Sequence, residues 1–201
     1  MMLKRLFDLL VSGIALVLLA PLLLAIGVAI KLDSRGPVFF RQERVGRFGR
    51  TFRIHKFRSM TVDAPALGPQ LTVGNDARVT RIGGFLRRHK LDELPQLIDV
   101  FVGDMSIVGP RPEVPRYVAL YSSEDRELVL SVRPGITDRA SIEFKDESEI
   151  LGKALDPEAA YRSEILPAKL AYYRAYAQER TFGGDIAIVV ATLMALVGRS
   201  R

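Results

Sequence analysis

Hydrophobic residues dominate the start of the chain, where no charged residue occurs between Leu9 and Ile30. This uncharged segment is longer than the about 20 apolar residues that an α-helix needs to cross the hydrocarbon core of a bilayer. A cleaved signal peptide would have a shorter apolar region followed by small residues, whereas Lys31, Asp33 and Arg35 follow this one. The pattern therefore predicts a helix that remains in the membrane.

Pro21 lies near the centre of this segment and predicts a kink, because proline removes one helical hydrogen bond and clashes with the preceding turn. Both flanks of the segment are basic: Lys4 and Arg5 precede it, and residues 31–58 contain nine basic and only two acidic residues. Since basic flanks tend to stay in the cytoplasm, they favour a re-entrant membrane helix hairpin over residues 1–32. A kinked helix that crosses the bilayer is the alternative.

Beyond residue 32 the pattern changes to short elements. Alternating apolar and polar residues predict strands at 38–42 and 53–60, and a loop rich in glycine and proline follows at 61–77. The apolar run 186–197 is too short to span a membrane comfortably, so we expect a buried or interfacial helix. Apolar residues at helical spacing and turn residues predict further helices at 80–88, 92–101, 123–130, 157–161 and 166–179.

These elements predict a predominantly helical α+β fold. We expect two parts, a membrane helix over residues 1–32 and a compact domain over residues 33–201. The second part would combine short strands with helices; the family resemblance described below implies that amphipathic helices of this part lie at the membrane interface, on the cytoplasmic face.

Composition narrows the classes of function. The 201-residue chain has no cysteine, which excludes disulfides, thiolate metal sites and a cysteine nucleophile. Its two histidines, His55 and His89, have no partner at metal-ligand spacing, and we interpret both as surface or packing residues. The formal net charge of +6 favours phosphates and acidic lipids as partners. Few aromatic residues accompany the basic ones, which adjoin the membrane segment, so we do not expect a nucleic acid.

Two consecutive carboxylates, Asp92 and Glu93, stand at the start of a predicted helix. Successive helical side chains point roughly 100° apart. One carboxylate can therefore face a reacting atom while the other holds a hard cation such as Mg²⁺. The helix dipole favours the anionic form of both, which keeps Asp92 competent as a nucleophile. An equally good interpretation is that Asp92 only caps the helix, with Pro95 in its first turn.

Three cationic residues are candidates for binding phosphate. Arg111 has a proline on each side, which restricts its backbone and suits a bidentate grip on a phosphate. A rigid surface turn is the alternative for this segment. Lys56, on a predicted strand, and Arg87, just before the acidic pair, could contribute further positive charge, although each taken singly is more often a solvated surface residue.

Six blocks of residues occur in a fixed order along the chain. They are KRxxD at 4–8, GPVFFRQxRxG at 36–46, KFRSM at 56–60, LDELPQ at 91–96, GDMSIVGPRP at 103–112 and RPGIT at 133–137. Together these blocks resemble the bacterial sugar transferases known as monotopic phosphoglycosyl transferases, and the resemblance runs from about residue 2 to 195.

The resemblance implies a reaction and a location. Such enzymes transfer a sugar 1-phosphate from a UDP-sugar to polyprenyl phosphate, usually undecaprenyl phosphate, and release UMP. They catalyse the first membrane step of glycoconjugate biosynthesis. By this resemblance we expect residues 33–201 to be the catalytic domain. We also expect an active site on the cytoplasmic face of the bacterial inner membrane, membrane lipids as partners, and downstream glycosyltransferases that use the product.

The resemblance also implies roles for single residues. Asp92 would form a covalent phosphosugar intermediate, Glu93 would act beside it and hold Mg²⁺, and Arg111 would bind phosphate, with Lys56 and Arg87 as further phosphate ligands. The chain departs from many relatives at three positions: Ala20 stands before Pro21 in place of serine, Asp99 in place of asparagine, and Asp138 in place of glycine.

Two other functions fit the same residues. A membrane-bound hydrolase could use the carboxylate pair to cleave a diphosphate. A basic membrane protein without catalytic activity could act as a scaffold in polysaccharide assembly. Recovery of the sugar phosphate on lipid would distinguish a transferase from the hydrolase, which would release it into water. Loss of activity on substitution of Asp92 or Glu93 would distinguish an enzyme from the scaffold.

Overall fold

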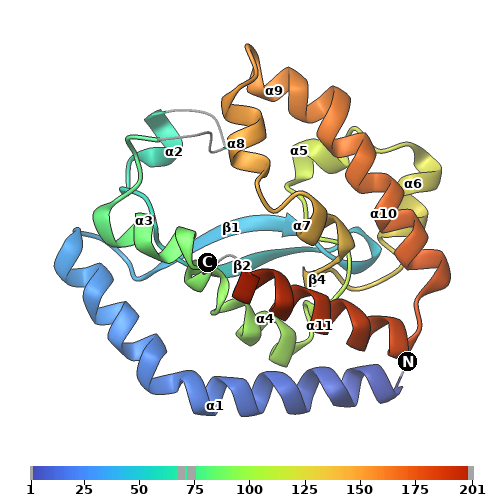
Figure 1. Ribbon diagram of the computed structural model, residues 1–201, viewed down its shortest axis with the longest axis horizontal. Helices are drawn as coiled ribbons and strands as arrows, with labels where there is room; N and C mark the ends of the chain where they lie inside the picture. The colour runs from blue at the N-terminus through green and yellow to red at the C-terminus, as the bar shows by residue number, and fades with distance from the viewer. Residues whose placement is uncertain (1, 68–70, 72–75, 199–201) are drawn as a thin grey trace.

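The computed structural model of the protein describes residues 2–67, 71 and 76–198. Its first element is α1 (Met2–Asp33), a helix that is long and apolar enough to cross a membrane by its length and composition. The helix is continuous but bends between its two halves (Figure 1), and Pro21 lies inside it. The bend agrees with the kink expected where proline interrupts the helical hydrogen bonds.

The strands are short and form two separate two-stranded sheets. β1 (Phe39–Val45) and β2 (Thr51–Phe57) are antiparallel, with Phe39 opposite Phe57, and a 3₁₀ turn, η1 (Arg47–Gly49), lies between them. β3 (Ser106–Val108) pairs in parallel with β4 (Gly135–Thr137). The predicted α+β class with short strands is therefore confirmed.

Helices account for most of the remaining chain and surround the two sheets (Figure 1). The predicted helix at 92–101 is interrupted: a 3₁₀ turn, η2 (Leu91–Glu93), precedes α4 (Gln96–Val102). The predicted loop at 61–77 contains a short helix, α2 (Ala64–Leu67), while residues 68–70 and 72–75 lie outside the described residues. The other helices are α3 (Arg81–Arg88), α5 (Pro115–Val118), α6 (Ser123–Val129), α7 (Arg139–Glu143), α8 (Glu147–Gly152), α9 (Pro157–Ala160), the π-helical turn η3 (Tyr161–Ile165), α10 (Leu166–Glu179) and α11 (Phe182–Gly198).

Both ends of α1 are fixed to the same body of strands and helices. Near its start, the buried carboxylate of Asp8 accepts a hydrogen bond from the Ser106 hydroxyl at 3.1 Å. At its end, Asp33 accepts one from the Ile82 amide at 3.1 Å. The buried guanidinium of Arg58 donates to two carbonyl groups just beyond the end of α1. The two halves of the bent helix therefore lie against one side of the molecule.

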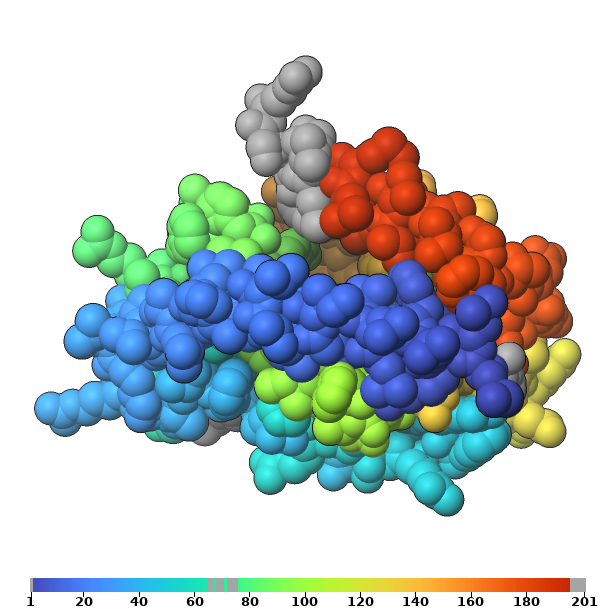
Figure 2. Space-filling view, turned by 90° about the horizontal axis from the view of Figure 1, so that it is seen from below, coloured from blue at the N-terminus to red at the C-terminus, as the bar shows by residue number. Residues whose placement is uncertain are grey.

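One face of α1 is buried and the other is exposed. Ile26 and Ile30 pack with Phe57 of β2 and Leu86 of α3. Figure 2 shows α1 running across the face of the molecule, with α11 beside its first half. The exposed apolar surface of α1 is unusually large for a protein surrounded by water and is typical of contact with lipid. The exposed apolar residues of α1 include Leu6, Leu10, Ile14, Val17, Leu18, Leu24, Val28 and Leu32.

Candidate active site

The acidic pair lies in η2, the 3₁₀ turn between α3 and α4. Lys90, just before the turn, has a left-handed backbone (φ 56°), and Pro95, not Asp92, is the residue that precedes α4. No side-chain hydrogen bond from Asp92 caps either element. The interpretation of Asp92 as a helix cap is therefore wrong, because the break at Pro95 starts the helix after the acidic pair. Its carboxylate is consequently available for other interactions.

Glu93 is held by two cations from distant parts of the chain. Both terminal nitrogens of Arg111 donate to its carboxylate, one of them to Oε2 at 3.1 Å. Lys56 Nζ, on β2, lies 2.8 Å from Glu93 Oε1. The side chain of Glu93 is only 16% exposed, so these charges interact more strongly than they would in water. The structure therefore brings together three of the predicted site residues.

These contacts determine the ionisation state of Glu93. Burial acts to raise the pKa of Glu93, but the charges of Arg111 and Lys56 and their hydrogen bonds hold it well below the ordinary value of 4.5. The carboxylate of Glu93 raises the pKa of Arg111 in turn. Both groups are thus charged at neutral pH, and together with Lys56 they carry one net positive charge next to Asp92.

Asp92 is the less constrained of the two carboxylates. Its nearest cation is Lys56, whose Nζ lies 3.8 Å from Asp92 Oδ2. No hydrogen bond to its carboxylate is found among residues 2–67, 71 and 76–198. The side chain is 9% exposed. A carboxylate oxygen that is close to a positive charge and free of described donors is suited to attack an electrophile.

The structure does not bring Arg87 to this cluster. It lies in the last turn of α3 and forms no ion pair with Asp92 or Glu93 within the part of the chain that the structure describes. Its assignment as a phosphate ligand therefore stays a prediction.

Two supporting contacts were not predicted. Asp99 of α4 accepts a hydrogen bond from the backbone amide of His55 at 2.8 Å, and its other oxygen lies 2.6 Å from His55 Nδ1. His55 precedes Lys56, so this contact fixes β2 beside the site. Arg44 of β1 donates to the carbonyl of Pro112 at 2.9 Å and so fixes the segment that carries Arg111. Burial lowers the pKa of Arg44, against the opposite effect of Glu113.

The donor set fits a magnesium ion that also binds substrate phosphates. Glu93 uses three of its about four lone-pair positions for Arg111 and Lys56, whereas those of Asp92 are free of described hydrogen bonds. No group of three acidic, histidine or cysteine side chains that could hold a metal occurs among the described residues. Mg²⁺ in proteins is commonly held by one or two carboxylates plus phosphates, and two carboxylates are present here.

A long apolar helix, together with a carboxylate pair and a cluster of cations, is typical of membrane-associated proteins that bind phosphates. Comparison with known proteins makes this specific. The chain belongs to the bacterial sugar transferase family, because the sequence model of that family matches residues 1–199. The resemblance inferred from the six sequence blocks is therefore confirmed.

Individual relatives agree with this membership. Over 200 residues the chain is 40% identical to the UDP-glucose:undecaprenyl-phosphate glucose-1-phosphate transferase of Xanthomonas campestris pv. campestris, covering 98% of this chain and 39% of the relative. It is 46% identical over 144 residues to the UDP-N-acetylgalactosamine-undecaprenyl-phosphate N-acetylgalactosaminephosphotransferase of Aeromonas hydrophila, covering 69% and 33%. The chain thus spans between 33% and 39% of the length of the first curated relatives that it matches.

Proposed function

We propose that this protein transfers a sugar 1-phosphate from a UDP-sugar to undecaprenyl phosphate, giving undecaprenyl-diphospho-sugar and UMP. The observation that carries the proposal is the position of Asp92, whose carboxylate accepts no hydrogen bond from the described residues, next to Glu93 and Lys56, with Arg111 paired to Glu93. The names of the relatives support the donor and acceptor classes, since they combine UDP-glucose or UDP-N-acetylgalactosamine with undecaprenyl phosphate. The reaction would begin a polysaccharide or glycoprotein glycan, which downstream glycosyltransferases would extend.

In the first half of the reaction, an oxygen of Asp92 attacks the β-phosphorus of the UDP-sugar. A new bond forms between that oxygen and phosphorus, and the bond from phosphorus to the bridging oxygen breaks, so that UMP leaves with the electron pair. The positive charge of Lys56 lies 3.8 Å from Asp92, and that of Arg111 is paired with the adjacent Glu93. They would stabilise the negative charge that develops on the phosphoryl oxygens.

In the second half, an oxygen of undecaprenyl phosphate attacks the phosphorus of the aspartyl phosphosugar. The bond to Asp92 breaks, and the carboxylate is regenerated. Donor and acceptor thus react in turn at one residue, which gives ping-pong kinetics. A two-step reaction of this kind lets one small site serve a water-soluble substrate and a lipid substrate in succession.

Glu93 has two roles in this proposal. Its charge orients Lys56 and Arg111, which meet at its carboxylate in the absence of substrate. Its remaining lone pair would hold Mg²⁺ together with substrate phosphates. The bound ion would neutralise part of the diphosphate charge and favour departure of UMP.

The membrane placement is part of the proposal. We infer that α1 enters the cytoplasmic side of the bacterial inner membrane, turns at the bend near Pro21 and returns. Attachment of Asp8 and Asp33 to the same body supports this, because a helix that crossed the bilayer would carry one end far from the body. The site would then lie at the depth of the lipid headgroups, where the phosphate of the acceptor lies.

Transfer of label tests the reaction directly. Protein in detergent would be incubated with UDP-sugars labelled in the sugar, undecaprenyl phosphate and Mg²⁺, using a panel that includes glucose and N-acetylgalactosamine donors. We expect label in the organic phase, equimolar with UMP, and none with Asp92→Asn. Glu127→Gln, which changes an exposed carboxylate on α6, is the matched control. Label recovered only as water-soluble sugar phosphate would contradict transfer and identify a hydrolase.

A further inference from the structure

A second charged cavity lies away from the acidic pair. It has a volume of about 350 Å³ and is enclosed by the first turns of α1, by η1, by the segment before β4 and by the turn between α10 and α11. None of Asp92, Glu93, Lys56 or Arg111 lines it. Five cationic side chains and two carboxylates line it: Lys4, Arg5, Arg47, Arg133 and Arg180, with Asp8 and Asp185.

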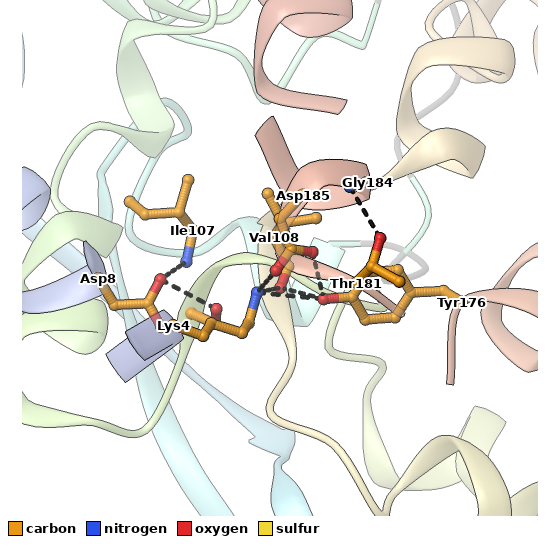
Figure 3. Close-up of polar contacts among 9 residues, drawn as sticks. Lys4, Asp8, Ile107, Val108, Tyr176, Thr181, Gly184 and Asp185 are labelled. Carbon is orange, nitrogen blue, oxygen red and sulfur yellow. Dashed lines mark hydrogen bonds and ion pairs between the residues drawn. The ribbon is translucent and has the colours of Figure 1, made fainter. Parts of the chain in front are cut away.

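The two carboxylates are already satisfied by protein groups, as Figure 3 shows. Asp185 is paired with Lys4 Nζ at 2.6 Å and accepts the hydroxyl of Tyr176 at 2.8 Å. Asp8 accepts hydrogen bonds from β3, including one from the Ile107 amide at 3.0 Å. The charge of Asp185 is therefore balanced by Lys4, and Asp8 forms no ion pair with an arginine among the described residues, so the cavity keeps an excess of positive charge.

Two of the five cationic side chains already form contacts within the protein. Lys4 is neutralised by Asp185, and Arg5 donates both terminal nitrogens to carbonyl groups at the end of α4, those of Val100 and Phe101, at 2.7 and 2.8 Å. Both residues therefore connect α1 to the body of the protein. The remaining three arginines come from three separate segments and have no carboxylate partner among the described residues.

Arg47, Arg133 and Arg180 form a cluster of like charge. Arg47 and Arg133 each use Nε to donate to one carbonyl, those of Ser131 and Gly103, at 2.9 Å. No ion pair of these three arginines occurs among the described residues, and Arg180 has no hydrogen bond there either. Burial lowers the pKa of Arg47, and the neighbouring charges of Arg133 and Arg180 lower it further. An anion in the cavity would relieve this repulsion.

The surroundings indicate where the anion comes from. Leu3 and Phe182 line the same cavity and are 60% and 38% exposed, and Leu6 of the adjacent turn is 54% exposed. The cavity is thus lined by residues at the starts of α1 and α11, which lie side by side in Figure 2. A guanidinium cluster next to an apolar surface matches a molecule with a phosphate at one end and acyl chains at the other.

We propose that this cavity is a binding site for the phosphate headgroup of an anionic phospholipid, separate from the site of transfer. Arg133 and Arg180 bind the phosphate, with Arg47 beside them, and the acyl chains lie along the exposed faces of α1 and α11. The proposal depends on the membrane placement of α1 proposed above but not on the transferase reaction. A lipid held there would fix the first turns of α1 at the depth of the headgroups.

Lipid retention by the whole protein tests this inference. Full-length protein in neutral detergent would be mixed with phosphatidylglycerol or phosphatidylcholine, and bound lipid would be counted by native mass spectrometry. We expect one phosphatidylglycerol to be retained in preference to phosphatidylcholine. Arg180→Gln removes no described hydrogen bond and should weaken retention about fivefold, and Arg133→Gln combined with it about 25-fold. Arg180→Lys, which keeps the charge, should weaken it less.

The control is Arg162→Gln, which removes an exposed charge from η3, outside the cavity; it should retain lipid like the unmodified protein. Equal retention of phosphatidylglycerol by the unmodified protein and Arg180→Gln would overturn the proposal. So would stabilisation of the unmodified protein by inorganic phosphate without retention of lipid, because the site would then bind a soluble anion. The measurement needs no turnover, so its failure would leave the proposed transferase reaction standing.

Discussion

At the scale of single residues, the site separates two neighbouring carboxylates by their surroundings. Glu93 is bonded to Arg111 and Lys56, whereas Asp92 lies 3.8 Å from Lys56 and has no described donor. A carboxylate whose lone pairs are occupied by donors is a weaker nucleophile than one whose lone pairs are free. On this basis we propose a division of roles in which Asp92 attacks and Glu93 orients the two cations.

Substitution of Asp92 should abolish transfer without unfolding the protein. Asp92→Asn keeps the shape of the side chain but removes the attacking oxygen, so we expect the rate to fall at least about a thousandfold. The melting temperature should change little, because no described hydrogen bond to the carboxylate is lost. Initial rates of UMP release and thermal unfolding in detergent measure the two effects. Retention of more than a tenth of the activity would show that another group attacks.

Substitution of Glu93 should instead destabilise the fold. Glu93→Gln leaves Lys56 and Arg111 facing each other, which should cost about 3 kcal/mol and lower the melting temperature by about 6–12 °C at pH 7. Because the pKa of Glu93 is lower in the folded protein than its ordinary value of 4.5, its stabilisation is present above that pH. The stabilisation is lost as the pH falls through the folded value.

Thermal unfolding between pH 7 and pH 3 checks this prediction. The difference in melting temperature between the unmodified protein and Glu93→Gln should shrink below pH 4.5. The exposed Glu127→Gln should show almost no difference at any pH. A difference that is constant with pH would mean that the charge of Glu93 does not hold the two cations.

At the scale of elements, the site depends on how β2 lies against α4. Asp99 of α4 binds both the backbone amide and the ring of His55, the residue next to Lys56. Burial raises the pKa of Asp99, while the hydrogen bonds from His55 act in the opposite direction. The contact therefore positions Lys56, although burying the charged carboxylate of Asp99 costs free energy of folding.

Two substitutions at Asp99 separate hydrogen bonding from charge. Asp99→Ala leaves the His55 amide without an acceptor, and we expect a loss of about 1–3 kcal/mol and slower transfer. Asp99→Asn keeps an oxygen acceptor and avoids burying a charge, so its melting temperature at pH 7 should equal or exceed that of the unmodified protein. Melting curves and initial rates of both variants decide this. An Asn variant as unstable as the Ala variant would show that the charge itself is required.

The elements also show what the sequence could predict. Apolar periodicity located α1, α3, α6 and α10, since each depends on a local pattern. It did not show that η2 separates the acidic pair from α4, because the left-handed backbone of Lys90 has no signature in the apolar pattern of the sequence. The pairing of His55 with Asp99 joins residues 44 apart, and no spacing rule in the sequence indicates it.

At the scale of the whole molecule, α1 determines where the chemistry can occur. Its apolar outer face, its bend and the attachment of both ends to one body are consistent with a shallow membrane anchor. Hydropathy predicted the membrane segment, and Pro21 predicted the bend. The attachments could not be predicted, because Asp8 meets a residue 98 positions away. The arginine cavity could not be predicted either, because its charged residues come from distant segments of the sequence.

Labelling of single cysteines tests the proposed placement of α1. The chain has no cysteine, so Met2→Cys, at the start of α1, and Arg35→Cys, just beyond its end, can be modified selectively in membrane vesicles; both positions are exposed. Both should react with an impermeant maleimide only from the cytoplasmic side, as should Leu155→Cys on the body. Labelling of the first two positions from opposite sides would replace the re-entrant helix with one that crosses the bilayer.

The covalent intermediate is the central claim, and mass spectrometry of the intact protein tests it most directly. Protein incubated with its UDP-sugar and Mg²⁺ but without lipid acceptor should gain the mass of one sugar phosphate and release one UMP per chain. Peptide analysis should place the added mass on Asp92, and undecaprenyl phosphate should remove it. An active protein that forms no adduct, or one that forms it on a residue other than Asp92, would contradict the account.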